Sequence, residues 1–106
     1  MGKADKLRDG LREFDSIKKD ELDLAPIEKW MVRKLGVKRE PARGGSAVRY
    51  SHPILKKLGR DGVFTVHKKH KKKEKITRFD YKTYLRPRIC EIIELMGKEE
   101  TSDKSN

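Results

Sequence analysis

The sequence predicts an α+β fold in which two helices cover one face of a three-stranded antiparallel sheet, with an extra helix at the N-terminus. Two observations indicate this fold. Apolar residues recur at helical spacing towards both ends of the chain, and short β-branched or aromatic runs lie between them, separated by glycine and proline. The elements are therefore expected in the order helix, helix, three strands, helix.

The first expected helix spans residues 3–17. Gly10 stands in its middle and lowers the helix propensity by about 1 kcal/mol, so we expect this helix to be only marginally stable. We assign residues 1–20 to an N-terminal helical extension. The apolar stripe of the helix consists of Leu7, Leu11, Phe14 and Ile17.

A second helix is expected over residues 24–35. Pro26 suits its first turn, and Gly36 suits its C-terminal end. The spacing of its apolar residues is the most regular in the N-terminal half of the chain. These residues are Leu24, Ile27, Trp30, Met31 and Leu35.

Three short extended segments follow, and we predict strands at residues 37–40, 46–52 and 63–67. A glycine-containing turn at residues 41–45 would join the first two strands as a hairpin. Residues 53–62 are expected to form a basic connection that is partly helical. Its glycines mark turns.

Residues 68–75 are too highly charged for a core position and are expected in a solvent-exposed loop. A final helix should run from about Thr83 to Met96, with Pro87 in its first turn and Gly97 as its stop. The side chains that it is expected to bury are Leu85, Ile89, Ile92, Ile93 and Met96.

The predicted folded domain comprises residues 21–97, and residues 98–106 are expected to be a disordered tail. A chain of 106 residues has room for one domain with a small core. The order helix, three strands, helix within this domain is the layout of double-stranded-RNA-binding domains.

The composition favours an anionic partner. The chain has 28 Lys and Arg against 17 Asp and Glu, a formal net charge of +11, which suits a polyanion or an acidic protein.

Cys90 is the only cysteine, so an intramolecular disulfide and a cysteine-based zinc site are excluded, and a reducing compartment is expected. No apolar stretch has the length of a membrane span or the character of a secretion signal, so we expect a cytoplasmic protein that does not interact with membranes.

The most informative motif is Gly45-Ser46-Ala47-Val48-Arg49-Tyr50-Ser51-His52-Pro53. Alternation along it places Ala47 and Arg49 on one face of a strand and Val48 and Tyr50 on the other. The run resembles the HicA toxin family, the YcfA-like small ribonucleases, whose hallmark is Gly-Ser-His followed by an aromatic residue and His-Pro. The residues in register with this hallmark are Gly45, Ser46, Tyr50, His52 and Pro53.

Ala47 occupies the position of the family's catalytic histidine. The resemblance, which covers about residues 22–96, implies the toxin of a type II toxin-antitoxin system. Such a toxin is a metal-independent endoribonuclease that cleaves mRNA without a cofactor and pairs with an acidic HicB-type antitoxin. An imidazole suits acid/base catalysis because its pKa lies near neutrality, whereas a methyl group cannot transfer a proton. The chain therefore represents either a nuclease silenced at one side chain or a natural relative that binds RNA without cutting it.

The three histidines of the chain are candidate functional groups. His52 lies at the end of a strand, on the face opposite Ala47, and we expect it to have a supporting role at most. His67 and His70 are three residues apart, but without a cysteine or an acidic cluster nearby they make a weak metal site. Family members often carry two histidines at this spacing, which implies a role near the RNA. His67 is the candidate for a second catalytic or phosphate-contacting group.

Most of the excess positive charge is local. Residues 63–88 hold ten basic residues against Glu74 and Asp80, and such a concentration attracts the phosphates of an RNA backbone. The alternative interpretation of these basic residues is a solvent-exposed loop that only aids solubility. Arg43 and Arg49 flank the glycine motif and can extend the same surface. The predicted RNA-binding residues are Arg43, Arg49, Lys68, Lys69, His70, Lys71, Lys72 and Lys73.

Overall fold

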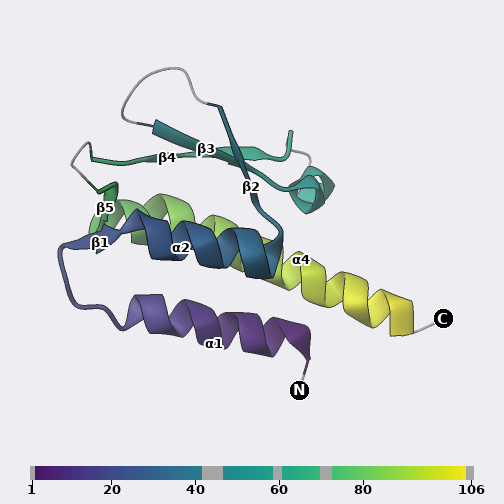
Figure 1. Ribbon diagram of the computed structural model, residues 1–106. Helices are drawn as coiled ribbons and strands as arrows, with labels where there is room; N and C mark the ends of the chain where they lie inside the picture. The colour runs from purple at the N-terminus through teal and green to yellow at the C-terminus, as the bar shows by residue number, and fades with distance from the viewer. Residues whose placement is uncertain (1, 42–46, 59–60, 70–72, 105–106) are drawn as a thin grey trace.

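Three strands form one antiparallel sheet, and helices cover only one of its faces (Figure 1). The computed structural model describes residues 2–41, 47–58, 61–69 and 73–104, with side chains as far as residue 98. The elements are α1 (Lys3–Asp15), β1 (Glu21–Asp23), α2 (Leu24–Trp30), η1 (Met31–Leu35), β2 (Lys38–Glu40), β3 (Ala47–Ser51), η2 (Pro53–Leu58), β4 (Val63–His67), β5 (Lys75–Thr77), α3 (Arg78–Asp80), η3 (Tyr81–Leu85) and α4 (Arg86–Lys104).

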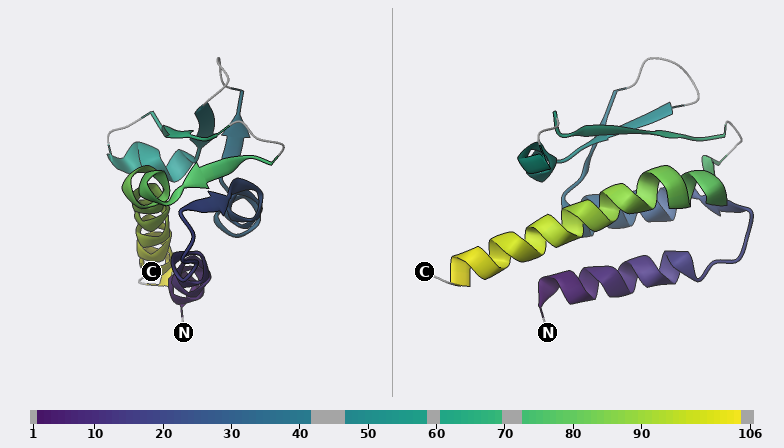
Figure 2. Two further views of the ribbon diagram at one scale, coloured as in Figure 1. Left: turned by 90° about the vertical axis from the view of Figure 1, so that its left-hand side faces the viewer. Right: turned by 180° about the vertical axis from the view of Figure 1, so that it is seen from behind.

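The sheet has the strand order β2-β3-β4, which confirms the predicted three-stranded antiparallel sheet. Directly paired residues of antiparallel strands project to the same face. Val48 pairs with Val66 and Tyr50 with Phe64, and all four side chains are buried against the helices. The opposite face carries no helix in either view of Figure 2, and we call it the open face.

The segment after β4 was predicted as a loop, but it returns to regular structure at β5. β5 pairs with β1 in a second, two-stranded antiparallel sheet, in which Leu22 faces Ile76 and both side chains are buried. This pair was missed because each strand has three residues and buries a single apolar side chain. No alternation of apolar and polar residues is long enough there to indicate a strand.

The last helix is longer than predicted at both ends. It begins at Arg78, where the Thr77 hydroxyl accepts a hydrogen bond from the Asp80 N–H at 3.0 Å and caps the first turn. It also passes through Gly97, so the predicted stop there is wrong. A Cβ atom on Gly97 would lie 3.3 Å from Cβ of Ala4, so this glycine serves the close approach of α1. Residues 98–104, for which the sequence favoured disorder, continue the helix to Lys104.

The N-terminal helix is part of the core. In Figures 1 and 2, α1 lies on the side of α2 and α4 that faces away from the sheet, and it buries Leu7 and Leu11. Its C-terminal end is fixed by Asp15, which accepts hydrogen bonds from the Tyr81 hydroxyl at 2.8 Å and from Nε of Arg86 at 3.0 Å. Burial acts to raise the pKa of Asp15, but the hydrogen bonds from Arg86 and Tyr81 outweigh it and leave that pKa lowered.

Gly10 lies where α1 approaches α2 closely enough to leave no room for a side chain. A Cβ atom at this position would lie 2.6 Å from Nε1 of Trp30, whose ring also packs edge-on against Phe14 at 5.6 Å between centroids. The glycine that weakens the helix in isolation is therefore required by its packing.

Gly10→Ala is expected to destabilise the protein by about 1 kcal/mol. The overpacking against Trp30 costs about 1–3 kcal/mol, which exceeds the gain in helix propensity of about 1 kcal/mol. Urea unfolding followed by circular dichroism measures the change. The matched control is the same substitution in a Trp30→Leu background, where it should stabilise; destabilisation in both backgrounds would contradict the packing account.

Candidate nucleic-acid interface

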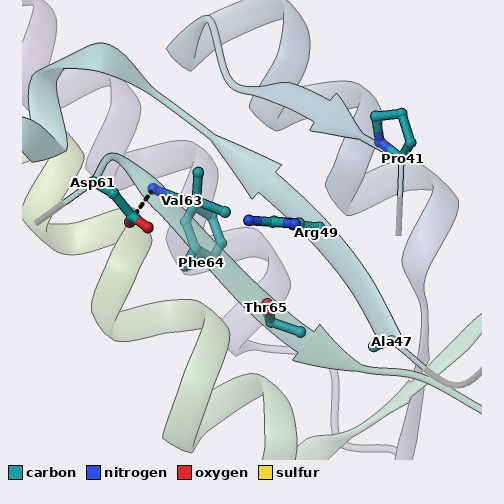
Figure 3. A pocket seen from close by; sticks show the side chains of 7 residues that line it. All are labelled: Pro41, Ala47, Arg49, Asp61, Val63, Phe64 and Thr65. Atoms are coloured by element: carbon teal, nitrogen blue, oxygen red, sulfur yellow. Dashed lines mark hydrogen bonds between the residues drawn. The ribbon is translucent and has the colours of Figure 1, made fainter. Parts of the chain in front are cut away.

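The open face of the sheet contains a shallow concavity of about 570 Å³ (Figure 3). Ala47 lies at one end of it and is partly exposed, with its methyl group on the solvent side of the sheet. Arg49 is exposed, and Figure 3 shows its guanidinium extending from β3 towards Val63 of β4. The lining residues are Pro41, Ala47, Arg49, Asp61, Val63, Phe64 and Thr65.

The sheet register brings Ala47 and His67 together. The two residues are direct partners across β3 and β4, so both side chains project to the open face, and His67 is exposed. Cβ atoms of such pairs are about 4.5–5.5 Å apart. Any larger side chain at position 47 would therefore stand next to the His67 imidazole, with Arg49 two residues along the same face.

His52 has a structural role. Its Nδ1 accepts a hydrogen bond from the Ile54 N–H at 3.1 Å, so Nε2 carries the hydrogen and donates to the Leu35 carbonyl at 2.7 Å. The imidazole thereby ties the end of β3 to the end of η1, and Pro53 opens the 3₁₀ turn η2.

Tyr50 belongs to the core and does not face the concavity. Its hydroxyl donates to Oε1 of Glu28 at 2.8 Å, and its ring packs against Phe64 at 5.6 Å between centroids. Burial and the neighbouring Glu28 carboxylate both raise the pKa of Tyr50 far above its usual value. Two members of the motif, Tyr50 and His52, therefore hold the strand in place.

Acidic side chains neutralise part of the basic run. Lys68 is only 10% exposed and pairs with Oε2 of Glu74 at 2.6 Å. Arg39 of β2 donates two hydrogen bonds to the same carboxylate, each at 3.0 Å, and a third to Glu28 at 2.9 Å. Lys69 pairs with Glu21 at 2.7 Å. The ammonium group of Lys68 is therefore engaged in an ion pair within the fold, and the side chain of Lys69 points towards β1.

Several of the predicted site residues lie within the described part of the chain. Ala47, Arg49 and His67 lie together on the open face, and Lys73 is exposed before β5. Thr65, opposite Arg49, was not singled out, although the alternation of β4 would have placed it there. No local sequence pattern indicated the Arg39–Glu74 ion pair, because it joins residues that are 35 positions apart in the chain. The predicted site residues that lie outside the described part of the chain are Arg43, Gly45, Ser46, His70, Lys71 and Lys72.

No protein family, curated protein or solved structure matches the chain. Within the described residues, no cluster of three or more histidine, cysteine or carboxylate side chains is arranged to hold a metal ion. No helix in the described part is long and apolar enough to cross a membrane.

Replacing the two described histidines by alanine should separate their roles. His52→Ala leaves the Leu35 carbonyl and the Ile54 N–H without their partner and is expected to cost about 1–3 kcal/mol of the free energy of unfolding. His67→Ala removes an exposed side chain and should change it by less than about 0.5 kcal/mol. Chemical denaturation measures both, and equal effects would contradict the assignment.

Glu74 gives the fold a pH-dependent contribution. Hydrogen bonds from Arg39 and Lys68 lower its pKa from 4.5 to about 2, so the ion pairs contribute fully above about pH 4.5 and are lost as the pH falls towards 2. The stability difference between the parent and Glu74→Gln should therefore shrink over this interval. Thermal unfolding between pH 2 and 7 tests this, with the exposed Glu13→Gln as control. A constant difference would contradict it.

Proposed function

We propose that this chain is a HicA-like toxin of the double-stranded-RNA-binding fold type, whose RNA-cleaving centre lies at position 47 and is silent because alanine stands there. The observation that carries this proposal is the direct pairing of Ala47 with His67 on the exposed face, beside Arg49. The layout of a three-stranded antiparallel sheet with helices on one face supports the fold type.

Two facing imidazoles would divide the proton transfers of RNA cleavage. In an Ala47→His chain the new imidazole accepts the proton of a ribose 2′-hydroxyl, whose oxygen attacks the adjacent phosphorus. The bond to the 5′-oxygen breaks, and that oxygen takes a proton from His67. Arg49 is placed to hold the phosphate charge. Because side chains carry both protons, the proposed reaction requires no metal ion.

The proposed partners are mRNA and an acidic antitoxin of the HicB type, both in the cytoplasm. The net charge of +11 and the exposed cations of the open face support an anionic partner of either kind. An antitoxin seated on the open face would cover Arg49 and His67 and so block the RNA.

A second function is a non-catalytic RNA-binding module with the same fold. It is favoured by one observation: the methyl group of Ala47 leaves His67 facing no second proton-transfer group across the β3–β4 pair. In that case the open face binds RNA and cleaves nothing.

Ala47→His is expected to confer cleavage of RNA in buffer containing a metal chelator, at least about 10²-fold above the parent. Adding His67→Gln to it should lower the rate by about 10²–10⁴-fold, because the second proton-transfer group is lost. Gel analysis of a labelled RNA measures both. A chain that binds RNA but remains inert after Ala47→His would favour the binding module.

A further inference from the structure

Two aromatic side chains are exposed on the last helix, away from the sheet concavity. Phe79 is 68% exposed and Tyr84 47%, the two highest values among large apolar side chains in the described residues. Their rings contact each other edge-on, with centroids 6.5 Å apart. We call Phe79 and Tyr84 the aromatic platform. The other exposed apolar side chains, Ile17, Val32 and Leu58, belong to other segments.

The local winding of the helix brings these rings together. In a regular α-helix, residues five apart lie about 140° from each other around the axis. Residues 81–85 form the π-helical segment η3, in which the Arg86 N–H donates to the Tyr81 carbonyl five residues before. In the wider π turn, residues five positions apart lie closer around the axis than in an α-helix, and such turns are frequent at functional sites. The π segment ends two residues before Pro87, whose nitrogen carries no hydrogen to donate in a regular helix.

Two basic residues stand close to the platform in the sequence. Arg78 precedes Phe79, and Lys82 is exposed one turn after it. The stretch 78–88 holds four basic residues against the single acidic residue Asp80. Its other cations are engaged, since Arg86 binds Asp15 and Arg88 pairs with Glu91. Aromatic rings next to basic residues match a ligand that combines flat bases with phosphates.

We propose that the aromatic platform stacks bases of a single-stranded RNA segment whose phosphates are held by Arg78 and Lys82. This inference rests on the proposed RNA binding and adds a second contact site to it. The elements that carry the two sites approach each other at one end of the molecule: β4 ends at His67, Lys69 pairs with Lys75, and β5 leads directly into α3 (Figure 1).

RNA fits this platform better than a protein partner does. Two aromatic side chains bury at most about 150–250 Å² each, whereas a standard protein interface buries about 800 Å² on each partner. Base stacking needs no wider apolar surface, because each base contacts one ring.

The test compares RNA affinities by fluorescence anisotropy with a labelled single-stranded oligonucleotide of about a dozen nucleotides. Phe79→Ala with Tyr84→Ala is expected to weaken binding about ten- to a hundredfold without a change in Tm, since both side chains are exposed. The conservative pair Phe79→Tyr with Tyr84→Phe should retain the affinity. The control, Val32→Ala with Leu58→Ala, removes two exposed apolar side chains elsewhere and should leave the affinity unchanged.

The outcomes separate the two proposals. An oligonucleotide of the same length with abasic sugars should bind the parent and the double alanine variant equally, because only stacking distinguishes them. RNA binding that is the same in the parent and the double alanine variant would overturn the platform and leave the proposed function standing. No RNA binding by the parent would overturn both. Loss of binding to an acidic protein, with RNA binding intact, would assign the platform to a protein partner and overturn this inference.

Discussion

The covering of the sheet on one face only is the constraint on which the rest of this molecule depends. Because strand side chains alternate, burying Val48 and Tyr50 against the helices requires Ala47 and Arg49 to project into solvent. The same alternation in β4 turns His67 outwards. A shift of one residue in register would exchange the two faces, so the packing of the core also fixes the candidate interface.

Not every basic residue of this chain is available to an anionic partner, because several already form ion pairs within the fold. The basic run appears in the sequence as an unbroken cationic surface, yet Glu74 engages Lys68 and Arg39, and Glu21 engages Lys69. Through these pairs Lys69 is linked to β1 and Glu74 is linked to β2. The cations that remain for a ligand stand at the flanks, on the open face and on the last helix.

Sequence patterns predicted the helices, the three strands of the main sheet and the outward direction of Ala47, because periodicity and alternation are local properties. They missed the β1–β5 pair, since three-residue strands carry too short a pattern, and they ended the last helix at Gly97, where tertiary packing against Ala4 decides. Sequence spacing also did not indicate the Arg39–Glu74 pair, which depends on a tertiary contact. Nor did it indicate the contact between the Phe79 and Tyr84 rings, which lies in a part of the helix that includes a π turn.

The motif around β3 combines two physically different halves. Tyr50 and His52 face inwards, and their hydrogen bonds to Glu28 and the Leu35 carbonyl position the strand. The Ala47 side chain faces outwards and is a methyl group, which forms no hydrogen bond. A substitution at position 47 can therefore change chemistry while the architecture stays intact. The inward-facing residues of the motif therefore serve the packing of the sheet, and only the outward-facing residues bear on the proposed chemistry.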